Sequence, residues 1–148
     1  MKDSNFIKIN YLIEIGCSNT PHSGTTLLEH LIGVYNILKE SGAQEYVCDA
    51  GLFHSIYGTI SFRHKTTEDR DKIRELIGNE SENLVYTFST LQRPRSFFIG
   101  ELKDCRLRED LILLNNANQL EMNKRPAPEM DLDEAYGNLW NYNSGRRS

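Results

Sequence analysis

The spacing of apolar residues predicts helices along most of the chain. In the first sixteen residues, Phe6, Ile9, Leu12 and Ile13 recur three or four positions apart, and this spacing places them on one side of a helix. Gly16 is a typical end for that helix. No part of the chain carries two β-branched runs with the alternation of strands. The pattern therefore predicts an all-α fold.

Two more helices follow, separated by a short turn. Thr26 and Glu29 have the spacing of a capping box at the start of an apolar-faced helix. Ser41-Gly42 is a typical end for it, because glycine accepts the left-handed backbone that closes many helices. A third helix is expected from about residue 43 to residue 54, where the stretch AGLFHSIYGT places His54 directly after an apolar run.

The second half of the chain predicts three further helices. Thr67 is expected to cap a charged helix over 68–78, and Ser81 to cap the next, ENLVYTFSTLQ, which Pro94 stops. A long helix is predicted from about Lys103 to Met122. Between these last two helices, residues 95–104 are predicted to be irregular, with a short extended piece at 97–99.

Length and prolines divide the chain into a body and a tail. A chain of 148 residues is enough for one domain with a single core, and we assign residues 1–125 to a helical bundle of about six or seven helices. Residues 126–148 are predicted to form a tail that carries two prolines and a short helix around 132–140. Trp140 in this tail could pack on its own domain or on a second copy, so a homodimer stays open.

Charge, hydropathy and cysteine content exclude several classes of protein. The net charge of −4 disfavours a sequence-independent nucleic-acid binder. No apolar run approaches the roughly 20 residues of a membrane helix, and the start of the chain lacks the apolar core of a secretory signal. The three cysteines are widely spaced and include no CxxC pair, which favours a reducing, cytoplasmic location over a disulfide framework.

The histidines are the strongest candidates for chemistry. The chain has only four, and His30 lies on the second predicted helix while His54 ends the third. Antiparallel helices joined by a short turn can bring such positions together, so we expect these two rings to face each other in the core. Pairs of imidazoles are common metal ligands.

The stretch EHLIGVYNILKESGAQEYVCDAGLFHS resembles the core of the HD-domain superfamily, and in particular the hydrolase domain of the ppGpp synthetase/hydrolase group. His30 matches the first histidine of that pattern and His54 the second, while NANQLEM matches the last motif, with Ala117-Asn118 at its Ala-Asp. The resemblance covers roughly residues 25–122. It implies an HD-like helical bundle with a metal centre for hydrolysis of a phosphorylated metabolite.

The chain departs from that pattern at its carboxylates. Ser55 stands at the Asp of the His-Asp doublet, Asn118 at the distal Asp, and Gly58-Thr59 at the acidic pair that follows the doublet. Hard divalent ions such as Mg²⁺ favour carboxylate oxygens, so ordinary HD phosphohydrolase activity is not expected. Glu121 lies one turn after Asn118 and can restore a carboxylate. We therefore predict His30, His54 and Glu121 as ligands of Zn, Fe or Mn.

A metal-free site is the alternative. Polar side chains between helices can line a pocket for a small molecule, and a histidine beside Glu or Tyr can then act as general acid or base. The predicted catalytic residues are His22, His30, His54 and Glu121. The predicted ligand-binding residues are Ser55, Tyr57, Arg63, His64 and Asn118.

Three functions remain compatible with the sequence. The first, which we favour, is an enzyme on a degenerate HD-like scaffold that acts on a small polar metabolite through His30 and His54, with or without a metal. The second is a catalytically inactive HD-like domain that binds a small ligand, a nucleotide or a protein partner. The third is a structural module in which the two histidines satisfy each other's hydrogen bonds.

Overall fold

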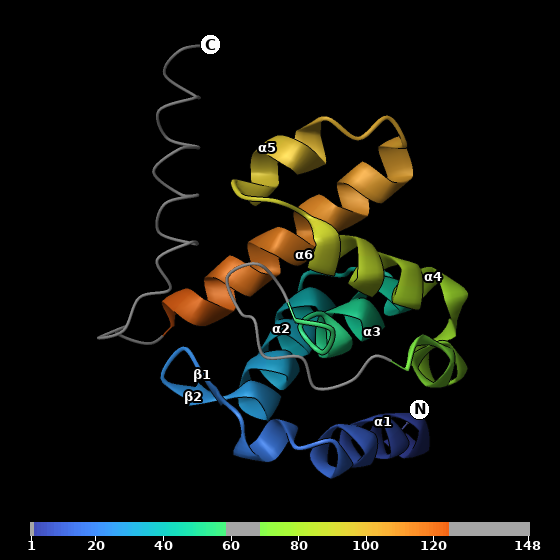
Figure 1. The fold of residues 1–148 in the computed structure, drawn as a ribbon, viewed down its shortest axis with the longest axis vertical. Coiled ribbons are helices and arrows are strands. Elements are labelled where there is room, and N and C mark those ends of the chain that lie inside the picture. Colours follow the sequence, from blue (N-terminus) through green and yellow to red (C-terminus); the bar gives the residue numbers. More distant parts are fainter. Residues whose placement is uncertain (1, 59–68, 125–148) are drawn as a thin grey trace.

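Six α-helices dominate residues 2–58 and 69–124, the part of the chain that the computed structural model describes (Figure 1). They are α1 (Lys2–Glu14), α2 (Leu27–Glu40), α3 (Glu45–Phe53), α4 (Arg70–Thr90), α5 (Arg95–Gly100) and α6 (Cys105–Asn123). A 3₁₀ turn (Cys17–Asn19) and a small antiparallel hairpin, β1 (Pro21–His22) with β2 (Thr25–Thr26), join α1 to α2. The expected all-α, single-domain fold is confirmed.

Helix α2 lies at the centre and contacts both α3 and α6, while α1 lies at one side of the bundle (Figure 1). The start of α2 matches the capping prediction, because the Thr26 hydroxyl accepts a hydrogen bond of 3.2 Å from the Glu29 backbone N–H. Its end is also as expected, at Ser41 with Gly42 in the left-handed region. The third helix ends at Phe53, and His54 is its C-cap.

Two local predictions in the second half are wrong. Residues 95–100 form α5 rather than an irregular or extended segment, because the Pro94 carbonyl starts a helical turn by accepting bonds from Phe97 and Phe98. Ser81 is not a helix cap: it lies inside α4, and its hydroxyl donates to the Tyr46 carbonyl at 2.6 Å. The break in α4 occurs instead at Gly78, whose backbone is non-helical.

Several predictions fall outside the described residues. Thr67, Arg63 and His64 lie in residues 59–68, and the tail over 126–148, with Trp140, follows the last described residue. No helix within residues 2–58 and 69–124 is long and apolar enough to cross a membrane.

Candidate functional site

His30 and His54 meet in the interior of the bundle, as predicted. Both side chains are fully buried. The Nε2 atoms of the two rings are 3.1 Å apart, and the rings meet edge to face, with centroids 5.0 Å apart. One ring comes from α2 and the other from the end of α3, so the site depends on how closely these two helices pack.

Gly51 allows that close packing. A Cβ atom at this position would lie 2.6 Å from Leu38 Cδ1 and 3.1 Å from Val34 Cγ1, both on α2. Distances this short are not compatible with an undisturbed core. The glycine in AGLFHS therefore sets the distance between α2 and α3 three residues before His54.

Asn118 brings a third polar atom from α6 to the same point. Its Oδ1 atom lies 2.9 Å from Nε2 of His30 and 3.0 Å from Nε2 of His54. The three atoms form a nearly equilateral triangle, because the third side is the 3.1 Å between the two nitrogens. Asn118 is 5 % exposed, so water has little access from this side.

The other nitrogen of each ring has a fixed acceptor. His30 Nδ1 lies 2.5 Å from Glu121 Oε1, and His54 Nδ1 lies 2.8 Å from the Gly51 carbonyl oxygen. An acceptor at Nδ1 favours the tautomer with the proton on Nδ1 and leaves Nε2 as a lone-pair acceptor. Burial, with a smaller contribution from His30, holds the pKa of His54 well below its ordinary value, which favours its neutral form.

Glu121 therefore does not occupy the ligand position predicted for it. It contacts the Nδ1 edge of His30, whereas His54 and Asn118 lie on the Nε2 edge, so His30, His54 and Glu121 do not converge on one point. Within residues 2–58 and 69–124, no group of three or more His, Cys, Asp and Glu side chains is placed to hold a metal ion. The position of Glu121 is that of a carboxylate that orients a histidine.

Gly33 makes room for this carboxylate. A Cβ atom at Gly33 would lie 2.7 Å from Glu121 Cγ and 2.9 Å from its Oε2. The absence of a side chain on this turn of α2 is thus what lets Glu121 reach His30 from α6. Nothing in the spacing of apolar residues indicates this role of Gly33.

His22 borders the same centre, and Ser55 is buried next to His54 in the sequence. The His22 ring, in the hairpin before α2, stacks on His30 with centroids 4.2 Å apart and an interplanar angle of 19°. Ser55 follows His54 directly and is 3 % exposed. His22, His30, His54, Asn118 and Glu121 are thus gathered in one region, as the sequence predicted for a polar site.

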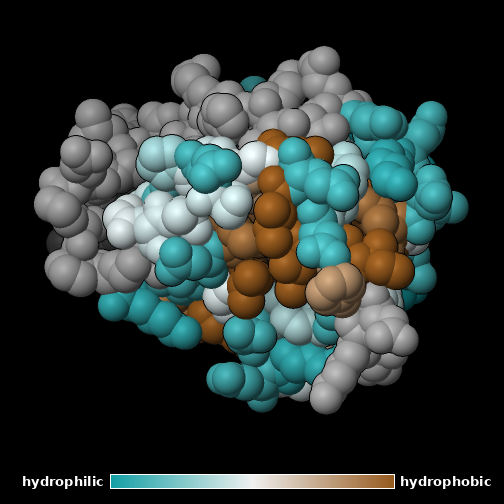
Figure 2. Space-filling model, turned by 90° about the horizontal axis from the view of Figure 1, so that it is seen from below, coloured by the Kyte–Doolittle hydropathy of each residue, from teal (hydrophilic) through white to brown (hydrophobic). Residues whose placement is uncertain are grey.

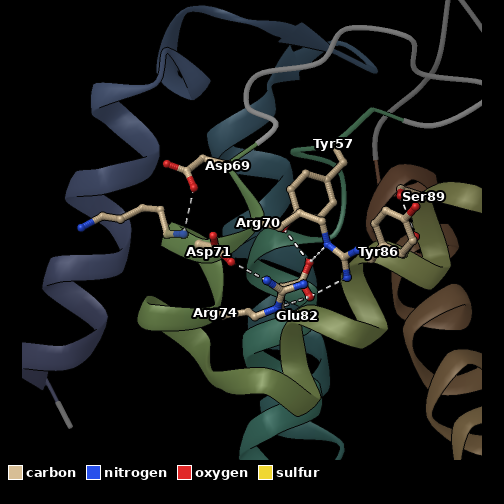
Figure 3. A network of polar contacts seen from close by, with 9 residues as sticks. Tyr57, Asp69, Arg70, Asp71, Arg74, Glu82, Tyr86 and Ser89 are labelled. Atoms are coloured by element: carbon tan, nitrogen blue, oxygen red, sulfur yellow. Dashed lines mark hydrogen bonds and ion pairs between the residues drawn. The ribbon is translucent and has the colours of Figure 1, made fainter.

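Tyr57 belongs to a different network (Figure 3). Its hydroxyl donates to Glu82 Oε2 at 2.8 Å. Arg70 donates to both oxygens of the same carboxylate, at 2.7 and 2.8 Å, and its guanidinium lies 3.6 Å from the centre of the Tyr86 ring. Arg74 Nε lies 3.4 Å from Glu82 Oε1. The hydroxyl of Tyr57, a predicted ligand-binding residue, thus fixes the segment after α3 to α4.

Glu82 is a residue that the sequence analysis missed. It is 1 % exposed. Burial raises its pKa, but the hydrogen bonds from Arg70 and Tyr57 and the charges of Arg70 and Arg74 outweigh burial, so the net shift is downward. Glu82 lies three turns after Arg70 on α4, and only the sharp bend at Gly78 lets two such distant residues of one helix meet. No regular helical spacing predicts this pair.

Comparison with known proteins gives one family. The model of a family described as "Domain of unknown function (DUF6817)" matches residues 11–93, which is more than half of the 148-residue chain. The match includes His22, His30 and His54 but ends before α6. No curated protein matches the chain, and no solved structure does.

Proposed function

The chain belongs to the DUF6817 family, and from its buried polar centre we propose that it is a metal-dependent enzyme on an HD-like scaffold that acts on a small polar metabolite. The observation that carries the proposal is the triangle of His30 Nε2, His54 Nε2 and Asn118 Oδ1, with sides of 2.9–3.1 Å. The motif resemblance over residues 25–122 supports the same interpretation from the sequence.

A lack of protons between His30 Nε2, His54 Nε2 and Asn118 Oδ1 would favour a bound cation among these three atoms. When both rings are neutral and carry their proton on the Nδ1 atom next to its acceptor, both Nε2 atoms present lone pairs, and Asn118 Oδ1 presents more. Three acceptors about 3 Å apart repel one another unless a positive charge or a proton lies between them. Ligand atoms about 2.1 Å from one ion, at the right angles of an octahedral site, are themselves about 3.0 Å apart, which agrees with the observed triangle.

The donor types indicate which ion fits. Two imidazole nitrogens suit Zn²⁺ or Fe²⁺ better than Mg²⁺, and a neutral amide oxygen in place of a carboxylate lowers the affinity for every divalent ion. His30, His54 and Asn118 would hold the ion, while Glu121 orients His30 and the Gly51 carbonyl orients His54. A divalent ion there would supply Lewis-acid polarisation of a substrate oxygen.

Metal analysis of the full chain, purified without chelators, tests the proposal. We expect close to one equivalent of Zn or Fe per chain in the wild type and less than a tenth of that in His54→Ala. Glu109→Gln, an exposed change on α6, is the matched control and is expected to keep the metal. Circular dichroism on all three proteins checks that each is folded.

Other outcomes identify the rival functions. A wild type without metal, in which His30→Ala and His54→Ala both unfold, contradicts the proposal and favours a structural pair in which the Asn118 amide is turned and donates to both rings. A metal-loaded wild type with no turnover of any polar metabolite, including phosphate esters, contradicts the enzyme and favours a catalytically inactive binding domain.

A further inference from the structure

Helix α1 turns an apolar face outward and a lysine inward. Phe6 is 67 % exposed and Ile7 56 % exposed, whereas Lys8, the next residue, is only 6 % exposed. Figure 2 shows the result on the side of the molecule that α1 forms: apolar residues gather in the middle of the face, with hydrophilic residues around them. Burial of a charge beside exposed apolar side chains is the reverse of the usual preference.

A buried ion pair fixes α1 in this orientation. Lys8 Nζ lies 3.0 Å from Asp49 Oδ1 on α3, and both side chains are at most 10 % exposed. Leu12, one turn later, is fully buried. Turning α1 by one residue position, about 100°, would bury Ile7 but leave Asp49 without its partner. The outward position of Phe6 and Ile7 is therefore specified by the fold.

These side chains line a groove between α1 and α4. The groove has a volume of about 340 Å³, and its walls include Phe6, Ile7 and Tyr11 from α1 and Leu76 from α4. Its charged lining residues are one acid, Glu14, and one base, Lys72. An apolar patch with a polar rim is typical of a surface that binds a partner.

We propose that the partner is a second copy of this chain, bound through the same groove about a two-fold axis. A two-fold interface must be self-complementary, and a groove with one acid and one base meets this condition, because Glu14 of each copy can face Lys72 of the other. A membrane surface fits less well, since helices that bind anionic lipids carry mainly Lys and Arg beside their apolar face. The groove is lined by seven residues, whereas a stable interface has about 20–30 residues on each side, so the dimer is expected to be weak, with a Kd of about 10–100 μM.

Sedimentation velocity of the full chain between 1 and 300 μM tests the proposal. We expect a concentration-dependent monomer–dimer equilibrium in the wild type, and at least a tenfold weaker one in Phe6→Ser/Ile7→Ser. Phe97→Ser, which removes another exposed aromatic residue, on α5, is the matched control and should dimerise as the wild type does.

Charge exchange identifies the partner as a second copy. Glu14→Lys and Lys72→Glu each place like charges across both halves of the proposed interface, so each variant alone should be monomeric. Mixed in equal amounts, they should form a heterodimer, because the two basic groups in the groove of one variant then face the two acidic groups of the other. A wild type that stays monomeric to 300 μM, or a mixture that fails to associate, overturns the proposal. Binding of the wild-type monomer to anionic vesicles that is lost in Phe6→Ser/Ile7→Ser would assign the apolar face of α1 to a membrane instead.

Discussion

His30 and His54 differ from ordinary buried histidines in the groups that surround their Nε2 atoms. A single buried imidazole can satisfy both nitrogens with one donor and one acceptor. Here Glu121 and the Gly51 carbonyl occupy both Nδ1 atoms, and the two Nε2 atoms are directed at each other and at Asn118. The sequence predicted that His30 and His54 meet, but not which edge of each ring would face the other.

Glu121 shows the limit of the prediction at this scale. Its spacing from Asn118 placed it correctly on the inner side of α6, and it is 4 % exposed. Which His30 nitrogen it reaches depends on side-chain angles and on the space left by Gly33, and neither can be derived from spacing. The sequence therefore found the right residue and its pairing with a histidine, but the predicted role of Glu121 as a metal ligand does not agree with its position.

Gly33→Ala tests this role. The added methyl group would displace the Glu121 carboxylate from His30 Nδ1. Loss of a carboxylate that orients a metal-binding histidine weakens metal affinity about 10- to 100-fold, and we expect a change of this size for Zn²⁺ in isothermal titration calorimetry. Gly100→Ala, where a Cβ atom meets nothing within 4 Å, is the control. An unchanged affinity in Gly33→Ala would show that Glu121 does not orient His30.

At the scale of elements, most helices were predictable, but α5 and the orientations of the helices were not. The apolar spacing identified α1, α2, α3 and α6, because each carries a long periodic pattern or a clear cap. The same pattern did not show that α1 buries Lys8 and exposes Phe6, because that choice depends on Asp49, forty-one residues away in sequence. The break at Gly78 agrees with the predicted end of the charged helix at residue 78, but the contact of Arg70 with Glu82 across this break was not predicted.

The Lys8–Asp49 pair gives an element-scale prediction. Lys8→Ala leaves the Asp49 carboxylate buried without its partner, and we expect the free energy of unfolding to fall by about 3 kcal/mol. The double variant Lys8→Met/Asp49→Leu removes both charges and fills the space, so it is expected to lie within about 1 kcal/mol of the wild type. Urea denaturation measures both. Equal losses in the two variants would mean that the pair does not hold α1 through its charges.

The contact between Glu82 and the segment after α3 gives a pH-dependent prediction. Because the folded-state pKa of Glu82 lies below its ordinary value, its contribution to stability is complete above the ordinary pKa of about 4.3 and is lost as the pH falls below it. Glu82→Gln should therefore cost about 2 kcal/mol at pH 7, and the difference from the wild type should shrink below pH 4. Urea denaturation from pH 3 to 7, with Glu109→Gln as control, tests this. A difference independent of pH would contradict it.

At the scale of the whole molecule, α2, α3 and α6 meet at one centre through contacts that differ widely in sequence separation. The turn between α2 and α3 is local, and this is why the pairing of His30 with His54 could be predicted. Asn118 and Glu121 lie on α6, some ninety residues after His30. Only the resemblance to the HD-domain pattern, with the spacing of Glu121 from Asn118, indicated their place. His22 also lies beside His30, as the sequence predicted, while Tyr57 is turned toward Glu82.

Binding of an ion to three helices at once should stabilise the whole domain. A ligand present at 100 times its Kd stabilises the folded state by about 2.7 kcal/mol, which corresponds to a rise in Tm of about 5–10 °C for a chain of this size. We expect Zn²⁺ to raise the Tm of the metal-depleted wild type by this amount and to leave that of His54→Ala unchanged. An equal rise in both proteins would place the bound ion elsewhere.

The imidazole nitrogens themselves provide the most direct test of the proposed centre. Long-range ¹H–¹⁵N correlation spectra of the metal-depleted protein distinguish a protonated from an unprotonated ring nitrogen. We expect His30 and His54 both to carry the proton on Nδ1, and both Nε2 resonances to shift together when one equivalent of Zn²⁺ is added. A proton on Nε2 of either ring, or Nε2 resonances that do not respond to Zn²⁺, would contradict a cation-binding centre between the two helices.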